Sequence, residues 1–239
     1  MIAPDVKAVL FDMDETLIEN TRSFQDIARD LFYSFGDALA PVCFDEFWPV
    51  FWGRAVDMWN MMVDGVLAGD VARSYVFINT LRALGADTSL ADAMLLKTDE
   101  LQLAATRLPG DTVPVLQQLR RAGLRLGIVT NGFKATQWMK VSHHKLDEHV
   151  DFVLVSEEAG SHKPDRRIFE LALARAEVQA TEALFVGDMP DNDIEGARGA
   201  GIPGVLIDFH GRFAHDRVPA VGRISRLSEL LAPGFLLHN

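Results

Sequence analysis

Residues 6–17, VKAVLFDMDETL, are the most informative segment of the sequence. Its first half is an apolar run of the kind found in a strand buried inside a parallel sheet. The run ends at two aspartates spaced two apart, Asp12 and Asp14, and Thr16 follows them. Ligands of open α/β sheets bind beyond the carboxyl ends of the strands. Two carboxylates this close repel each other unless they share a cation or a proton, so the stretch indicates a metal site, an acid–base pair, or both.

Four further strand-like runs follow, and helical patterns separate them. The runs are Leu124–Thr130, Val150–Ser156, Ala183–Asp188 and Gly204–Asp208. The helical patterns cover residues 112–122, 168–176 and 194–200. Such an alternation predicts an α/β fold, with a parallel sheet covered by helices on both faces.

The gap between the first two strands, about residues 17–108, is far longer than an ordinary crossover. Apolar residues recur in it at helical spacing in four stretches, which are 24–35, 44–59, 71–84 and 89–105. We therefore expect an inserted helical domain over residues 17–108 and a core domain over residues 1–16 and 109–239. The aromatic stripe that ends at Trp59 is interpreted mainly as the interior of this insert.

The composition limits the class of protein. The chain has 239 residues, of which 49% are hydrophobic and 24% charged, as in ordinary globular proteins. Its formal net charge of −11 argues against nucleic acid or an anionic membrane as a partner. The single cysteine, Cys43, excludes an internal disulfide, and no signal peptide or membrane-spanning run is recognised. We expect a cytoplasmic protein, and the sequence does not determine its oligomeric state.

Polar residues recur where the predicted strands end. They are Thr130, Asn131 and Gly132 after the second strand, Lys163 after the third, Gly187, Asp188, Asp191 and Asp193 after the fourth, and, more weakly, Asp208 after the fifth. Each alone has an ordinary explanation as a helix cap, a turn or solvated surface. Together, at successive ends of one sheet, they predict one site. Carboxylates that bind Mg²⁺ or attack phosphorus, beside a lysine that binds a phosphoryl oxygen, favour phosphoryl transfer.

The set resembles the four motifs of the haloacid dehalogenase-like (HAD) hydrolase superfamily, and its phosphatase branch in particular. The matches are DMDET at Asp12, Asp14 and Thr16, then Thr130, then Lys163-Pro164, and finally Gly187-Asp188 with Asp193. The resemblance covers about residues 5–16 and 109–210. It implies a Rossmann-like parallel sheet core with an inserted α-helical cap domain. Within the superfamily the core is similar to phosphoglycolate phosphatase-like and nucleotidase-like members.

The resemblance also implies a role for each acidic residue. Asp12 would be the nucleophile and a ligand of Mg²⁺. Asp14 would act as general acid and base, and would bind the metal through its backbone carbonyl. Asp188 would hold the metal through its carboxylate, and Thr16 would support the site.

The remaining residues of the motifs would bind the substrate. Thr130 would bind the phosphoryl group, aided by Asn131. Lys163 would balance the charge on Asp12 and on the phosphoryl group. Asp193 would orient Lys163, although the spacing leaves Asp191 as an alternative for that role.

The resulting prediction is a Mg²⁺-dependent phosphatase that hydrolyses a small-molecule phosphomonoester through an aspartyl-phosphate. A dehalogenase is the main alternative, but the dehalogenases of the superfamily are expected to lack the acid at Asp14. A phosphonate hydrolase would use a cap lysine, and the insert contains only Lys97. A non-catalytic binding module would be expected to lose the nucleophile or the acid, and this chain keeps both.

Overall fold

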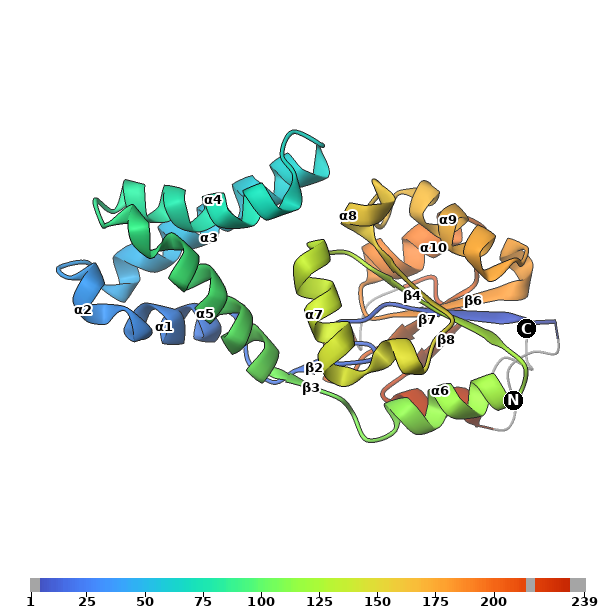
Figure 1. Cartoon of the computed structure of the whole chain (residues 1–239). Coiled ribbons are helices and arrows are strands. Elements are labelled where there is room, and N and C mark those ends of the chain that lie inside the picture. Colours follow the sequence, from blue (N-terminus) through green and yellow to red (C-terminus); the bar gives the residue numbers. More distant parts are fainter. Residues whose placement is uncertain (1–4, 214–217, 233–239) are drawn as a thin grey trace. The chain divides into compact units, whose positions relative to one another are not determined.

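The chain folds into two compact units in a computed structural model that describes residues 5–213 and 218–232 (Figure 1). The core unit takes Met1–Glu19, Arg107–Gly132 and Val141–Asn239. The helical unit takes Asn20–Thr106 and Phe133–Lys140. Parts of the predicted core domain, residues 1–4, 214–217 and 233–239, lie outside the described residues.

The core unit is built on a six-stranded sheet in the order β5-β4-β1-β6-β7-β8, and all neighbouring strands in it are parallel. Phe11 in β1 lies opposite Ile128 on one side and Val186 on the other. The parallel α/β fold predicted from the sequence is confirmed. The strands are β1 Ala8–Phe11, β4 Arg125–Thr130, β5 Phe152–Val155, β6 Ala183–Gly187, β7 Gly204–Ile207 and β8 Gly222–Ile224.

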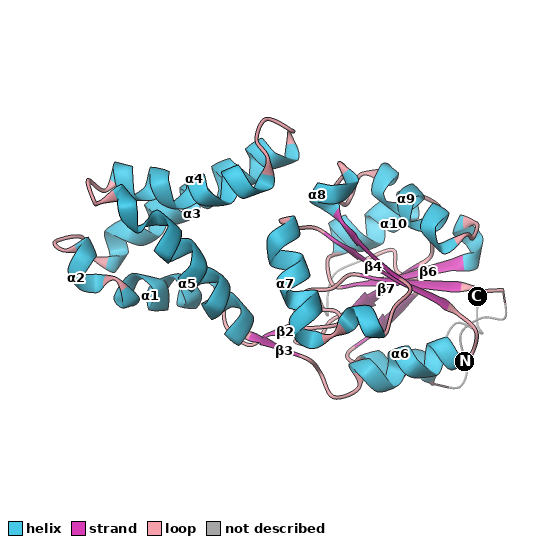
Figure 2. Ribbon diagram, viewed as in Figure 1, coloured by secondary structure: helices cyan, strands magenta, loops and turns pink. Residues whose placement is uncertain are grey.

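Helices cover both faces of this sheet (Figure 2). Alternate strand residues point to opposite faces, so Leu10 and Phe185 pack on one face against Ile168 and Phe169 of α9. Helix α6 covers the opposite face and buries Leu116. The core helices are α6 Thr112–Arg121, α8 Ser156–Ala159, α9 Arg166–Ala176 and α10 Gly196–Gly199, with 3₁₀ turns at Leu146–Glu148, Ala180–Glu182 and Leu227–Leu231. Helix α7, Lys134–His144, belongs to the helical unit up to Lys140 and to the core unit from Val141.

Some elements differ from the sequence prediction. The helix expected over residues 194–200 is a π-helical turn, Pro190–Glu195, followed by the short α10. The wide turn arises because the amides of both Asp193 and Ile194 donate to the carbonyl of Met189. The sequence analysis did not identify α7, β8 or the paired strands β2 Glu19–Asn20 and β3 Thr106–Arg107.

The helical unit packs around an aromatic interior. The rings of Phe47 and Phe51 stack at 5.3 Å, and both side chains are buried, whereas Trp52 is 47% exposed. Among the described residues no helix is both long and apolar enough to cross a bilayer. The helices of the helical unit are α1 Phe24–Ser34, α2 Gly36–Leu39, α3 Phe44–Val63, α4 Gly69–Ala83 and α5 Ala91–Ala104, with a 3₁₀ turn at Thr88–Leu90.

The division of the chain adds one segment that the predicted boundaries did not include. Residues Phe133–Lys140 group with the helical unit, although the predicted insert covered only residues 17–108. The ring of Phe133 packs edge to face on Trp59 at 5.4 Å and joins the apolar cluster of that unit. A single ring contact of this kind leaves no periodic pattern in the sequence.

Candidate active site

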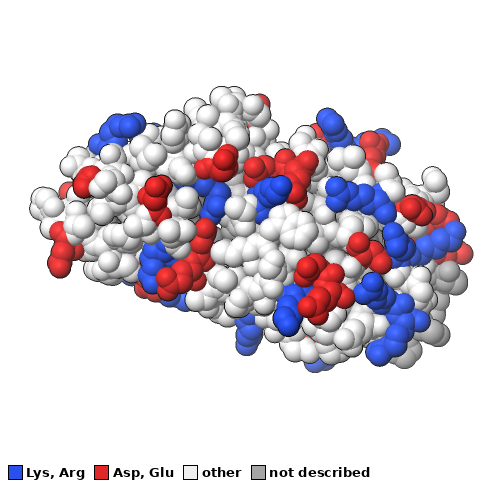
Figure 3. All heavy atoms as spheres, in the orientation of Figure 1, with Lys and Arg blue, Asp and Glu red and all other residues white. Residues whose placement is uncertain are grey.

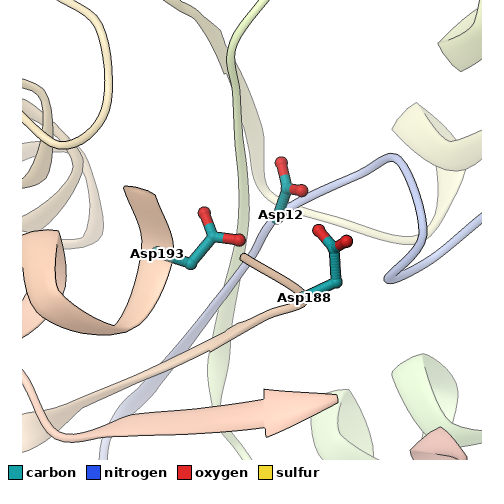
Figure 4. Close-up of side chains that lie close together, drawn as sticks. All are labelled: Asp12, Asp188 and Asp193. Atoms are coloured by element: carbon teal, nitrogen blue, oxygen red, sulfur yellow. The ribbon is translucent and has the colours of Figure 1, made fainter. Parts of the chain in front are cut away.

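The site forms at the edge of the sheet where three neighbouring strands end. Because β1 lies between β4 and β6, Asp12, Thr130 and Asp188 follow or close strands that are adjacent in space. Ligand oxygens of Asp12, Asp188 and Asp193 lie within 4.8 Å of one another. Figure 4 shows the three carboxyl groups converging. Residues separated by more than half of the chain therefore form one acidic cluster.

Lys163 is buried against this cluster. Its ammonium Nζ donates to Oδ1 of Asp12 at 2.6 Å and to Oδ1 of Asp193 at 2.7 Å. The lysine side chain is only 3% exposed. A buried ammonium requires such partners, because an unpaired charge in the interior is strongly unfavourable. The predicted proximity of Lys163 to both acids is present in the structure.

The Gly-Asp pair after β6 has a packing reason. A methyl group at position 187 would overlap the carboxyl group of Asp193, so Gly187 leaves the space that this carboxylate occupies. The amide of Met189 donates to the other oxygen of Asp193 at 2.9 Å. Of the two acids that the sequence left open, Asp193 contacts Lys163, whereas Asp191 is exposed.

The turn after Asp12 carries the other acidic residue. The carbonyl of Met13 accepts hydrogen bonds from the amides of Thr16, Leu17 and Ile18, and this folds the chain sharply. Asp14 is partly buried in that turn and is not a member of the carboxylate cluster. The Thr16 hydroxyl is buried and has no hydrogen-bond partner within the described part of the chain.

The end of β4 carries the two predicted substrate-binding residues. Thr130 is the last residue of the strand and is buried. The side chain of Asn131 bonds with the backbone of Lys163 in both directions: Nδ2 donates to the carbonyl at 2.9 Å, and Oδ1 accepts from the amide at 2.8 Å. Asn131 thus connects the loop after β4 to the segment that carries Lys163.

One residue at the site was not identified from the sequence. Nη2 of Arg212 donates to Oδ2 of Asp188 at 2.8 Å. The loop that carries Arg212 is organised by Asp208, whose two carboxylate oxygens accept the amides of Arg212 and Phe213, each at 2.9 Å. Asp208 was a weak candidate from its place after the fifth strand, but no pattern in the sequence linked Arg212 to Asp188.

Burial and neighbouring charges shift the pKa values of the cluster. Burial raises the pKa of Asp12 well above its usual value, and the nearby Asp193 and Asp188 raise it further against the opposing effect of Lys163. Burial also raises the pKa of Asp188 to about 6, although the hydrogen bond from Arg212 lowers it. Burial alone would lower the pKa of Lys163, but Asp12 and Asp193 outweigh it and raise the pKa.

The cluster suits a divalent cation. Three buried carboxylates close to one another supply the hard oxygen ligands that such a cation prefers, and a cation would relieve their mutual repulsion. Elsewhere the surface is mixed. On the face drawn in Figure 3, lysine and arginine lie interspersed with aspartate and glutamate rather than gathered in a large patch of one sign.

A parallel α/β core that gathers carboxylates and a buried lysine at its strand ends has the features of a hydrolase that works through acidic residues. Comparison with known proteins gives the family. A model of haloacid dehalogenase-like hydrolases matches residues 6–201, so the chain belongs to this family. The predicted family and enzyme class are therefore confirmed.

Individual relatives lie within the same family. The glyceraldehyde 3-phosphate phosphatase of Methanopyrus kandleri is 31% identical over 204 residues, covering 84% of each chain. The phosphoserine phosphatase of Thermus thermophilus is 30% identical over 228 residues, covering 85% of this chain and 89% of that protein. The crystal structure of a 2-haloacid dehalogenase from Pseudomonas syringae pv. Tomato aligns with a TM-score of 0.73 at 28% identity, covering 97% of this chain and 98% of the other.

Proposed function

We propose that this protein is a Mg²⁺-dependent phosphatase that hydrolyses a small-molecule phosphomonoester through an aspartyl-phosphate. The observation that carries the proposal is the contact of the Lys163 ammonium with Asp12 and Asp193, at the edge where Asp188 completes the cluster. The similarity to proteins named as phosphatases, which covers about 85% of the chain, supports it. We also propose that the helical unit is the cap domain expected from the sequence.

In the first step an Asp12 oxygen attacks the phosphorus atom, and the bond from phosphorus to the ester oxygen breaks. Asp14 gives its proton to the departing oxygen, so the alcohol leaves neutral. The ammonium of Lys163 and the hydroxyl of Thr130 stabilise the negative charge on the transferring group. Lys163 is suited to this task because it is buried and already placed beside Asp12.

In the second step Asp14 takes a proton from a water molecule, which attacks the phosphorus of the aspartyl-phosphate. The bond from phosphorus to Asp12 breaks, which releases inorganic phosphate and restores the free carboxylate of Asp12. Asp193 does not react in this scheme. It keeps Lys163 in place through their 2.7 Å contact.

We assign the Mg²⁺ ligands to the carboxylates of Asp12 and Asp188 and to the backbone carbonyl of Asp14. When bound, the ion supplies positive charge that neutralises the transferring phosphoryl group. The fit rests on the oxygen-only donor set and on the close approach of the acids. Supporting roles remain for Thr16, which packs in the turn after Asp12, and for Asp193.

The substrate is proposed to be small. The names of the similar phosphatases refer to glyceraldehyde 3-phosphate and phosphoserine, which are phosphorylated metabolites rather than polymers. The net charge of −11 accords with a partner other than nucleic acid. Activity in the cytoplasm, without a membrane partner, completes the proposal.

The test is a panel of about a hundred phosphorylated metabolites, with free phosphate as the readout. We expect release from a subset of the panel, loss of release in EDTA and recovery on addition of Mg²⁺. The Asp12→Asn protein serves as the matched control, because the substitution keeps the size of the side chain. No phosphate release from any ester, or release unaffected by chelation, would contradict the proposal.

A dehalogenase is the second candidate, favoured by the structural similarity to the 2-haloacid dehalogenase. The chain differs from the expected dehalogenase pattern at Asp14, which supplies an acid two residues after the nucleophile. Chloride release from a 2-haloacid, measured beside phosphate release from p-nitrophenyl phosphate, separates the two. A phosphonate hydrolase is disfavoured, because Lys97 of the insert pairs with Glu100 at 2.7 Å.

A further inference from the structure

We propose that Asn131 is a positioning residue that acts through Lys163, rather than a direct ligand of the substrate. This inference rests on the proposed role of Lys163. It replaces the substrate contact expected for Asn131 from the sequence.

The side-chain amide of Asn131 pairs with the backbone of Lys163 as one peptide group pairs with another. It donates to the carbonyl at 2.9 Å and accepts from the amide at 2.8 Å, across 32 residues of sequence. The geometry requires an amide, because aspartate has no donor for the carbonyl and leucine has neither group. Both polar ends of the side chain therefore face Lys163.

A second bond joins the same two loops. The amide of Gly132 donates to the hydroxyl oxygen of Ser156 at 3.1 Å, and Ser156 begins the segment that leads to Lys163. The loops that follow β4 and β5 are thus joined at two places beyond the end of the sheet. Of these two connections, the one made by Asn131 involves the backbone of Lys163, the residue whose side chain enters the site.

The ammonium of Lys163 must be placed accurately to keep its contacts with both acids. Its contacts to Asp12 and Asp193 are 2.6 and 2.7 Å, and both acids are held by other strand ends. A shift of the Lys163 backbone would lengthen these contacts or move the charge away from the phosphoryl group. Displacements of about 1 Å in a catalytic group cost roughly 100-fold in rate. Fixing the backbone of Lys163 is therefore a sufficient role for Asn131.

The first experiment compares kcat and KM for p-nitrophenyl phosphate in wild type, Asn131→Ala and the control Gln117→Ala, an exposed position in α6. We expect kcat to fall about 10- to 100-fold in Asn131→Ala, with KM changed by less than about threefold. Gln117→Ala should behave as wild type. A rise in KM at unchanged kcat would overturn the proposal, because it would show that Asn131 binds the substrate directly.

A double-mutant cycle with Lys163→Met tests whether Asn131 acts through the lysine. In the Lys163→Met background, Asn131→Ala should reduce the residual rate by less than about twofold. A full additional loss would show an independent role and would reject the inference. If Lys163→Met keeps the wild-type rate, the proposed function of Lys163 fails instead, so the two failures are distinguishable.

A readout that does not depend on catalysis keeps the test decisive if the variants are inactive. Hydrogen exchange of the Lys163 backbone amide reports the bond to Asn131 directly. We expect this amide to exchange at least about tenfold faster in Asn131→Ala, while amides in β1 keep their protection. Unchanged exchange at Lys163 would show that Asn131 does not hold this backbone.

Discussion

Two groups of paired charges, a buried one in the core unit and a partly buried one in the helical unit, differ in their balance of charge. In the core unit, three carboxylates face two cations: Lys163 contacts Asp12 and Asp193, and Arg212 contacts Asp188. In the helical unit, Arg73 of α4 pairs with Asp99 of α5 in a one-to-one contact. That pair lines a pocket of about 90 Å³, together with apolar side chains such as Phe51, Phe77 and Leu95.

The balance of charge distinguishes a site suited to a further cation from an ion pair that needs none. Carboxylates in excess of their cationic partners are unstable in the interior, and a further cation relieves them. A single arginine and a single aspartate neutralise each other and need nothing more. The core cluster is therefore suited to a cation that would relieve its repulsion, whereas the Arg73–Asp99 pair joins two helices.

The largest expected effect is on catalysis at the core cluster. Asp12→Asn should reduce turnover by at least about 10³-fold, because the amide oxygen cannot replace the carboxylate as nucleophile. The rate of phosphate release checks this, with circular dichroism as the measure of folding. A folded variant with a rate near that of wild type would remove the covalent mechanism, and with it the contrast between the two pairs.

Gly187→Ala should come next. The added methyl group would push the carboxyl group of Asp193 away and disturb Lys163, so we expect kcat to fall about 10- to 100-fold. The matched control is Gly199→Ala in α10, where a methyl group would meet no atom within 4 Å. That control should keep full activity and gain up to about 1 kcal/mol of stability. Equal behaviour of the two variants would contradict the packing role of Gly187.

In the helical unit the expected effect is on stability. Arg73→Met leaves Asp99 without its partner and should lower the free energy of unfolding by about 1–3 kcal/mol, since the two side chains are 12% and 22% exposed. The double variant Arg73→Met/Asp99→Leu should return to within about 1 kcal/mol of wild type. Chemical denaturation measures both. A double variant less stable than either single one would show that the charges do more than balance each other.

The smallest effect has the opposite sign. Asp188→Asn should stabilise the metal-free protein by up to about 2 kcal/mol at pH 7, because burial raises the pKa of Asp188 to about 6 and its ionised form is disfavoured on folding. The gain should be absent below pH 4, grow between about pH 4 and 6, and stay constant above. Thermal unfolding of both proteins across this range, without metal, checks the sign. Destabilisation at pH 7 would mean that Asp188 is a balanced charge like Asp99.

The sequence was sufficient to predict five of the six strands of the core sheet, all except β8, and to name residues that the structure brings together at the strand ends. The apolar run before Asp12 and the similar runs before Thr130 and Asp188 carry a strong signal, because buried parallel strands have few alternatives. Lys163 and Asp193 lie far from Asp12 in the sequence, and the resemblance to the family predicted that they share its site. The strand order that brings these segments together was not predicted from the sequence and comes from the structure.

Other features depend on single contacts and left no pattern. The pairing of Arg212 with Asp188 rests on one hydrogen bond from a loop. The direction of the Asn131 amide, toward Lys163 rather than toward the substrate, depends on how two loops meet. The π-helical turn at Pro190–Glu195 follows from two amides that share the carbonyl of Met189. Each depends on a local contact between segments and not on a periodic pattern of residues.

The loop that Asp208 organises contributes a charged residue to the site, although the loop lies outside the four motifs. The family match ends at residue 201, and the four motifs all precede that point. Arg212, which pairs with Asp188, comes after it. A protein trimmed to the matched region would keep all four motifs yet lose the cation beside Asp188, and it would also lose β7 and β8 and leave β6 as an open edge. Studies of minimal versions of this enzyme therefore need to extend through β8 to describe the same active site.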